Sequence, residues 1–271
     1  MGNALFVVWR ESLEAFLIAG ILYAWLKGND ATGRGRRALF IGLAAGVGLA
    51  VLLGWALLSV QDELTGNALE IFQIATLLVA SGLITQMVLW MKKNGRHMKA
   101  RLHADLSAAA QRSGFFGVAV VAALAVAREG AETVIFLYGM SQESSLGAVL
   151  LGALGGIAGA AATAWLAAKS LARLNIGLLL RLSSILLLIL ASALLVMAVD
   201  RMIGSGWLPA LVDPVWDTSR LIDDTTKGGK LLADFSGYRA RPALSTLLAY
   251  LAYWSVITLA YWKISRKNPH G

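Results

Sequence analysis

The sequence predicts an all-α, polytopic membrane protein with seven transmembrane helices. Its composition, its hydrophobic runs and the placement of its basic residues support this class. Of its 271 residues, 58% are hydrophobic and 15% are charged. A single soluble core of this length does not bury so large an apolar fraction, so lipid must cover part of the surface. We read the net charge of +8 as loop charge that sets membrane orientation, and we expect no nucleic-acid partner.

Seven apolar stretches are long enough to span a bilayer, which takes about 20 helical residues. They are residues 4–26, 38–60, 68–91, 115–140, 146–168, 177–199 and 243–262. The first lacks a basic leader and is interrupted by Arg10, Glu11 and Glu14, so we expect it to stay as a span rather than be cleaved. Residues 1–271 therefore form one transmembrane domain, with a long outer loop at 200–242.

Lys and Arg concentrate after the first, third, fifth and seventh stretches. The two short loops on the other side carry Asp62, Glu63 and Glu143 instead. Basic loops stay on the cytoplasmic side of a membrane. This bias predicts a multi-pass protein of the cytoplasmic (inner) membrane, with its N-terminus outside and its C-terminus inside.

Two copies of a three-helix unit are visible in the chain. Arg10-Glu11-Ser12-Leu13-Glu14 lies in the first span and Arg128-Glu129-Gly130-Ala131-Glu132 lies in the fourth. In the spans that follow, Gly42, Gly46 and Trp55 have the same spacing as Gly152, Gly156 and Trp165. Because three spans separate the copies, the repeats, about 1–92 and 115–200, have opposite orientations, and the last helix is an addition. Inverted repeats place a substrate site near the bilayer midplane.

Each motif forms a charged face on its helix. Residues three apart share a face, so Glu11 lies beside Glu14 and Glu129 beside Glu132, and each Arg reaches its own Glu four residues on. At about 2.5 to 3.5 kcal/mol per charge, six such charges facing lipid would cost on the order of 15 kcal/mol. They must therefore face the interior of the helix bundle.

These charges have two interpretations. In the structural one, Arg10 and Arg128 neutralise carboxylates and fix helix packing. Each motif, however, has two carboxylates for one guanidinium, which leaves about two uncompensated negative charges when all ionise. Buried charges of one sign require a cation or protonation. We therefore predict a cation pathway.

Other acidic residues could extend this pathway. Glu70 opens the third span and either adds a carboxylate or is favoured there by the helix dipole. Asp62 and Glu63 either collect cations at the outer mouth or belong to an ordinary solvated loop. Gly130, beside Glu129, could let an ion approach the backbone.

The ligand types restrict the ion. Cysteine is absent, and histidine occurs only at His97, His103 and His270, outside the predicted spans. Oxygen ligands favour hard ions such as ferric iron, manganese, magnesium or calcium over copper and zinc. The chain also lacks a phosphate-binding Gly-x-x-x-x-Gly-Lys loop, so a gradient or a partner must drive transport, and no cofactor is expected.

With these motifs, the chain resembles the oxidase-dependent iron permease family, which includes fungal high-affinity permeases and bacterial EfeU-type and FtrC-type permeases. The likeness extends from the two Arg-Glu-x-x-Glu motifs through Glu70 and the end of the third span, residues 87–92, to Trp216-Asp217-Thr218-Ser219 and Gly237-Tyr238. It implies a permease, not an enzyme, that imports iron as the ferric ion delivered after oxidation by a partner.

The resemblance also implies residue roles and partners. Glu11, Glu14, Glu129 and Glu132 would carry the iron, while Arg10 and Arg128 tune their charge. The delivering partner would be a periplasmic or extracellular iron-binding protein or a copper ferroxidase. The outer-loop acids that could receive the ion are Asp217, Asp223, Asp224 and Asp234.

Three alternatives stay open, and so does the oligomeric state, for which a homo-oligomer is one option. A transporter of manganese or lead would differ only in selectivity. An intramembrane carboxylate-metal oxidase would normally add Glu-x-x-His pairs, which the spans lack. A purely structural membrane subunit would tolerate Gln in place of these Glu residues.

Overall fold

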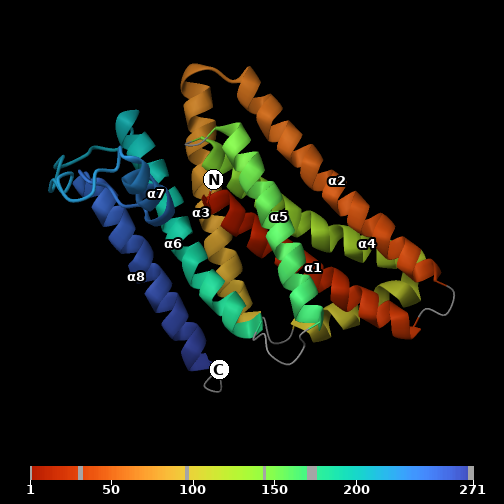
Figure 1. Cartoon of the computed structure of the whole chain (residues 1–271). Helices are drawn as coiled ribbons and strands as arrows, with labels where there is room; N and C mark the ends of the chain where they lie inside the picture. The colour runs from red at the N-terminus through yellow and green to blue at the C-terminus, as the bar shows by residue number, and fades with distance from the viewer. Residues whose placement is uncertain (1, 30–32, 95–97, 143–144, 170–175, 268–271) are drawn as a thin grey trace. The chain divides into compact units, whose positions relative to one another are not determined.

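The computed structural model describes residues 2–29, 33–94, 98–142, 145–169 and 176–267. Within these ranges the chain is helical and contains no strand. Its helices, drawn in Figure 1, are α1 (Gly2–Asn29), α2 (Arg34–Glu63), α3 (Gly66–Asn94), α4 (Met98–Ser141), α5 (Leu146–Lys169), α6 (Ile176–Gly204), α7 (Lys227–Ser236) and α8 (Leu244–Lys267).

Five helices among the described residues are long and apolar enough to cross a membrane. They are Arg34–Glu63, Gly66–Asn94, Leu146–Ala167, Arg181–Gly204 and Leu244–Arg266. The prediction of an all-helical, multi-pass membrane protein is therefore confirmed. The helices α1 and α4, which carry the charged motifs, are not among the five.

The helix α4 contains a break at Gly114, whose φ of 57° and ψ of −137° are not helical. Only glycine adopts such a conformation readily, because it has no Cβ. The break divides α4 into a first part from residue 98 and a second part from residue 115. The second part coincides with the predicted span 115–140.

The helix α6 extends beyond its predicted end at residue 199 and stops at Gly204. The apolar run ends at Asp200, but the charges that follow have partners and so do not end the helix. Thr246 and Arg239 bind Asp200, at 2.7 and 2.6 Å. Arg201 donates a 2.5 Å hydrogen bond to Gln73.

The short helix α7 lies inside the segment predicted to be the outer loop. Thr226 caps its N-terminus by accepting a hydrogen bond from Gly229 N, and Gly237, with a φ of 75°, ends it. Gly237 also packs against α6, where an added Cβ would lie 3.1 Å from Ala193 Cα. Both capping residues are visible in the sequence, but the helix is too short for its periodicity to reveal it.

The chain divides into two compact units. The first comprises residues 1–63 and 94–180, which include α1, α2, α4 and α5. The second comprises residues 64–93 and 181–271, which include α3, most of α6, α7 and α8.

In the first unit, α2 packs along α4 and α1 packs along α5. Glycines allow both contacts. A Cβ on Gly42 would lie 2.3 Å from Ala119 O, and one on Gly46 would lie 2.8 Å from Ala123 O. On α5, a Cβ on Gly156 would lie 2.7 Å from Leu5 O. Gly42, Gly46 and Gly156 therefore lie at close helix contacts, as small residues in membrane helices often do.

In the second unit, α6 is the most buried of the five apolar helices. Ser81 of α3 donates a 2.7 Å hydrogen bond to Ala191 O of α6. The hydroxyl of Tyr253 on α8 lies 2.9 Å from Thr85 Oγ1 on α3, and it donates to Leu188 O on α6. These bonds tie α3, α6 and α8 together inside a largely apolar interface.

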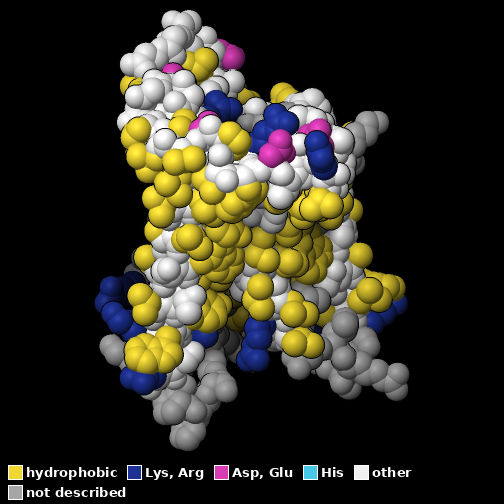
Figure 2. Space-filling model, turned by 90° about the vertical axis from the view of Figure 1, so that its left-hand side faces the viewer, with side chains coloured by type: hydrophobic (Ala, Val, Ile, Leu, Met, Phe, Trp, Pro, Cys, Tyr) yellow, Lys and Arg dark blue, Asp and Glu magenta, His cyan; other side chains and the backbone are white. Residues whose placement is uncertain are grey.

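The outer surfaces of the helices are apolar. Exposed side chains on α2 include Ile41, Val51 and Leu52, and those on α5 include Leu151 and Leu154. On the face drawn in Figure 2, hydrophobic side chains form a band across the middle; the charged side chains below the band are Lys and Arg, whereas above it Lys and Arg are mixed with Asp and Glu. Such a band is expected of a protein whose helices face lipid.

Candidate metal site

The two Arg-Glu-x-x-Glu motifs meet within the first unit. One oxygen each of Glu11, Glu14 and Glu129 forms a group whose members all lie within 4.8 Å of one another. Two of these residues come from α1 and the third comes from α4. Arg10 and the four glutamates are buried, as the sequence predicts for the motif residues, whereas the side chain of Arg128 is 45% exposed.

The guanidinium of Arg10 is enclosed by the carboxylates of its own helix. Arg10 Nη1 donates a 2.8 Å hydrogen bond to Glu11 Oε1. Arg10 Nη2 forms an ion pair with Glu14 Oε1 at 2.7 Å. The side chain of Arg10 is fully buried. The predicted pairing with the Glu four residues on is confirmed, and Glu11 is a second partner.

The second motif has a looser arrangement. Arg128 Nε donates a 3.1 Å hydrogen bond to Glu132 Oε1 and lies 3.9 Å from Glu129 Oε1. The side chain of Arg128 is 45% exposed, whereas that of Glu132 is 10% exposed. Arg128 therefore holds Glu132, which is not part of the group formed by Glu11, Glu14 and Glu129.

The ion pairs leave some carboxylate oxygens unsatisfied. The Oε2 atoms of Glu11, Glu129 and Glu132 are buried and have no hydrogen-bond partner in the part of the chain that the structure describes. Buried carboxylate oxygens without partners are costly, and a cation relieves that cost. Four carboxylates against two guanidiniums leave about two negative charges, as the composition of the motifs predicts. The cluster has the chemistry of a site for a hard, oxygen-binding cation.

Gly130 has a packing role. A Cβ at this position would lie 2.5 Å from Ala50 Cβ on α2. The absence of a side chain at Gly130 therefore lets α4 approach α2. The idea that the glycine opens the backbone to an ion is wrong, because Ala50 fills that space.

Glu70 lies near the start of α3, in the second unit. It accepts a hydrogen bond from Ser205. Gln73, about one helical turn after Glu70, accepts a hydrogen bond from Arg201. Glu70 thus takes part in contacts between α3 and the end of α6, and its predicted role on the pathway stays a prediction.

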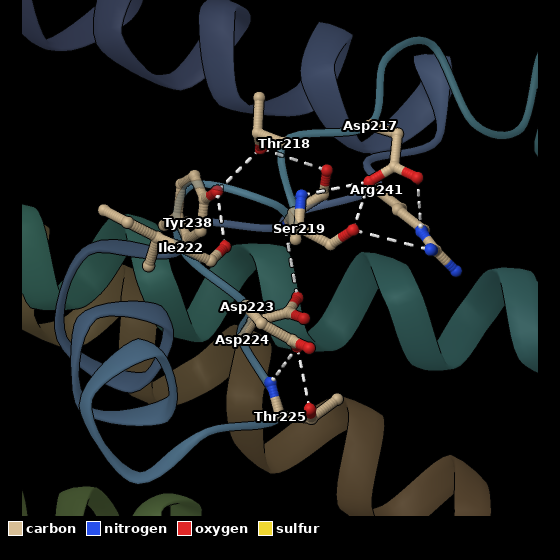
Figure 3. A network of polar contacts seen from close by, with 10 residues as sticks. Asp217, Thr218, Ser219, Ile222, Asp223, Asp224, Thr225, Tyr238 and Arg241 are labelled. Atoms are coloured by element: carbon tan, nitrogen blue, oxygen red, sulfur yellow. Dashed lines mark hydrogen bonds and ion pairs between the residues drawn. The ribbon is translucent and has the colours of Figure 1, made fainter.

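The predicted outer-mouth residues lie on exposed segments. Asp62 and Glu63 are exposed at the end of α2. Asp217 lies in the segment between α6 and α8, where Ser219 donates to Asp217 Oδ1 from its backbone N–H and its hydroxyl, and Arg241 forms a 3.1 Å ion pair with Oδ2 (Figure 3). These bonds, those from Ser219 first, lower the pKa of Asp217 to about 2.

The basic stretch 238–242 is part of the same network. Arg241 pairs with Asp217, and Arg239 pairs with Asp200 at the end of α6. Asp224 accepts a hydrogen bond from Ala240 N, at 3.1 Å. The arginines near the start of α8 thus neutralise specific carboxylates.

Sequence reasoning missed Trp9 and Thr163, which lie beside the first motif. Trp9, the residue before Arg10, donates a 3.1 Å hydrogen bond from Nε1 to Thr163 Oγ1. This bond joins α1 to α5. The position of Trp9 next to the motif was the available signal. It was overlooked because the partner is 154 residues away in the chain.

The fold and the site define a class: a multi-pass α-helical membrane protein with a buried carboxylate cluster built by two related motifs. The chain belongs to the Iron permease FTR1 family, whose model matches residues 1–264. The predicted family and the prediction that the protein is a transporter and not an enzyme are confirmed.

Several named relatives are similar to the chain over most of their length. The chain is 30% identical to the "Ferrous iron permease EfeU" of Escherichia coli O6:K15:H31 over 249 residues, 91% of this chain and 90% of the relative. It is equally similar to the protein of the same name from Shigella sonnei. It is 26% identical to that of Yersinia pestis, over 91% of this chain and 88% of the relative. No solved structure shows a significant match.

Proposed function

We propose that this protein imports iron across the cytoplasmic membrane through the carboxylates of its two motifs. One observation carries the proposal: Glu11 and Glu14 of α1 and Glu129 of α4 converge within 4.8 Å in a buried cluster. Glu132, held by Arg128, supplies a fourth carboxylate nearby. The family and the names of the relatives point to iron. The ion itself is the cargo, and the hard carboxylate set suits it.

The proposed topology has seven spans, with the N-terminus outside and the C-terminus inside. The helices α1 and α4 bring the five apolar spans to seven, because Arg10 and the four glutamates that interrupt their apolar runs are buried in the protein. Cation–π contacts support an inner boundary at the basic ends. Lys92 lies 3.5 Å from the ring centre of Tyr261, and Arg266 lies 3.6 Å from that of Trp262. Aromatic and basic side chains favour this boundary.

We also propose that α1–α3 and α4–α6 are inverted repeats within one permease domain. The packing of the first unit supports this, because the motif helix of each copy packs against the second helix of the other copy, α1 on α5 and α4 on α2. The close glycine contacts at Gly42, Gly46 and Gly156 have matching places in the two copies. The cluster then lies where two inverted halves meet.

The form of the ion and its source belong to the same proposal. Resemblance to the oxidase-dependent family favours ferric iron, delivered by an outer iron-binding protein or a copper ferroxidase. The relatives are named for ferrous iron, which makes ferrous iron the second candidate. Glu70, Asp62, Glu63 and Asp217 would assist at the outer side. Manganese or lead on the same carboxylates is the remaining alternative.

Uptake of radioactive iron into proteoliposomes tests this proposal. The wild type is compared with Glu14→Gln and Glu132→Gln. The control is Asp105→Asn, which changes an exposed carboxylate outside the proposed ion path. Ferrous iron with ascorbate and ferric citrate are supplied separately, each with and without excess manganese. We expect both motif variants to lose uptake by at least about tenfold, because each removes a carboxylate from the ion path.

Each result separates the candidates. Uptake from only one of the two iron supplies identifies the form of the ion. Competition by the excess manganese would assign a broader substrate range. If Glu14→Gln and Glu132→Gln both transport iron like the wild type while inserting normally, the motifs are structural ion pairs.

A further inference from the structure

The two motif arginines have different surroundings, although their motifs are related copies. The side chain of Arg10 is 0% exposed and that of Arg128 is 45% exposed. Arg10 uses both terminal nitrogens on Glu11 and Glu14, at 2.8 and 2.7 Å. Arg128 reaches Glu132 through Nε, at 3.1 Å. Both arginines face two buried carboxylates, Glu11 and Glu14 for Arg10 and Glu129 and Glu132 for Arg128, but only Arg128 has an accessible side chain.

The helices that carry the two arginines are also anchored differently. Trp9, one residue before Arg10, donates a hydrogen bond to Thr163 on α5. Its ring fills the space above Gly159, where an added Cβ would lie 3.3 Å from Trp9 Cδ1. The matching position before Arg128 is Ala127, whose methyl group makes no hydrogen bond. The first motif therefore has a side-chain anchor that the second lacks.

The carboxylates show the same asymmetry. Both Glu residues of the first motif, but only Glu129 of the second, belong to the group within 4.8 Å. Glu132 is drawn to Arg128, and its Oε2 atom is buried without a hydrogen-bond partner in the described part of the chain. Of the four motif carboxylates, Glu132 is thus the one that lies outside the candidate cation site.

We propose that Arg128 is a mobile positioning residue that holds Glu132 away from the cation site and transfers it to the arriving ion, while Arg10 is a fixed counter-charge. This inference rests on the proposed transport function. A multivalent cation beside Glu129 repels the guanidinium of Arg128, which is close to the same carboxylate. As Arg128 withdraws, Glu132 becomes the fourth ligand. Its return displaces Glu132 and favours release of the ion.

Iron uptake kinetics in proteoliposomes test whether Glu132 moves from Arg128 to the ion. Arg128→Gln leaves Glu132 permanently available, so the KM for iron should fall by about fivefold while the maximal rate falls at least as much, because release becomes slow. The KM for iron and the maximal rate of Arg128→Lys should lie between those of Arg128→Gln and the wild type. The matched control is Arg10→Gln, which should reduce the amount of folded protein instead. A purely structural Arg128 would lower protein yield without lowering KM.

A double-mutant cycle connects the effect to Glu132. The fall in KM caused by Arg128→Gln should be at least about threefold larger when Glu132 is present than in the Glu132→Gln background. An equal fall in both backgrounds would overturn the proposal, because Arg128 would then act on the ion directly. Loss of folded protein in Arg128→Gln, as in Arg10→Gln, would also overturn it.

Chemical modification in lipid nanodiscs tests mobility without transport. Treatment with phenylglyoxal followed by mass spectrometry should modify Arg128 and spare Arg10, and added iron should accelerate modification of Arg128. Equal reactivity of the two arginines would overturn the inference even if the protein transports iron. Conversely, wild-type protein that takes up no iron but whose Arg128 is modified faster when iron is added would overturn the proposed transport function and leave the mobile arginine supported.

Discussion

Arg10 shows how a single residue is both costly and necessary inside a membrane protein. Its side chain is completely buried, and its guanidinium contacts Glu11 and Glu14. A buried ion pair contributes little net stability compared with a well-packed apolar pair, but removal of one partner leaves the other charged and unpaired. The residue therefore matters chiefly through the carboxylates that it neutralises.

We predict that Arg10→Gln strongly destabilises the protein. Two carboxylates lose their counter-charge in a buried site, and the expected loss is about 3 to 5 kcal/mol of unfolding free energy. Thermal unfolding in detergent, followed by size-exclusion fluorescence, measures the change. Arg128→Gln is the matched comparison: it also uncovers two buried carboxylates, but because the Arg128 side chain is 45% exposed we expect a smaller loss than for Arg10→Gln. Equal losses would show that exposure does not distinguish the two arginines.

We predict that the segment around Asp217 loosens at acidic pH. The pKa of Asp217 is lowered to about 2, chiefly by the hydroxyl and backbone N–H of Ser219 and then by Arg241. Thr225 similarly lowers the pKa of Asp223. A lowered pKa stabilises the folded segment at every pH above the unfolded value, near 3.8, and this contribution disappears as the pH falls toward 2.

Hydrogen exchange at the Ser219 amide measures this loss, after correction for the pH dependence of the intrinsic exchange rate. Protection should be constant above about pH 4 and fall between about pH 4 and 2. Asp217→Asn should lower protection at neutral pH and remove most of the pH dependence. Protection that declines already between pH 7 and 5 would assign the transition to a different group.

At the scale of helices, close contact between α2 and α4 brings the second motif into place. Gly42 and Gly46 lie against backbone atoms of α4. In a membrane, helices associate through packing and not through the hydrophobic effect, so small residues at the contact decide how closely they approach. The position of Glu129 thus depends on residues that have no chemistry of their own.

We predict that Gly42→Ala separates α2 from α4. The added methyl group would lie 2.3 Å from Ala119 O. Such overpacking typically lowers the free energy of unfolding by about 1 to 3 kcal/mol. Gly48→Ala on the same helix is the control, because nothing lies within 4 Å of a Cβ there. Melting temperature in detergent should fall for the first variant and be unchanged or slightly higher for the second. A similar melting temperature for both would contradict the close contact.

For the whole molecule, the absence of cysteine makes the proposed topology directly testable. Single cysteines can be placed in the chain without removing any native ones. We predict that Thr225→Cys, in the long segment between α6 and α8, reacts with a membrane-impermeant maleimide in intact cells. Ala108→Cys, in the first part of α4, should react only after the cells are opened. Both residues are exposed, so the reverse pattern would invert the orientation.

Much of this architecture follows from the sequence because membrane helices have a strong local signal. Each of the seven apolar stretches lies within a few residues of a helix, the fourth with the part of α4 after Gly114, because a helix in an apolar environment must satisfy its backbone hydrogen bonds internally. The convergence of Glu11, Glu14 and Glu129 could also be inferred, because six charges cannot face lipid. The end of α6 could not be inferred, because Asp200 is stabilised by Arg239 and Thr246, which lie far along the chain. The helix α7 could not be inferred because it is too short for its periodicity to reveal it.

The sequence by itself determined the helical membrane class, the related motifs and the types of ligand available to a cation. These depend on composition and on spacing within one helix, so they can be read locally. Only the tertiary structure decided that Arg10 is buried while Arg128 is accessible, that Glu132 pairs with Arg128 and lies outside the group of the other three carboxylates, and that Gly130 serves packing. Those differences arise from contacts between helices. The contacts depend on how each copy of the repeat packs against the other, and no single segment of the sequence encodes them.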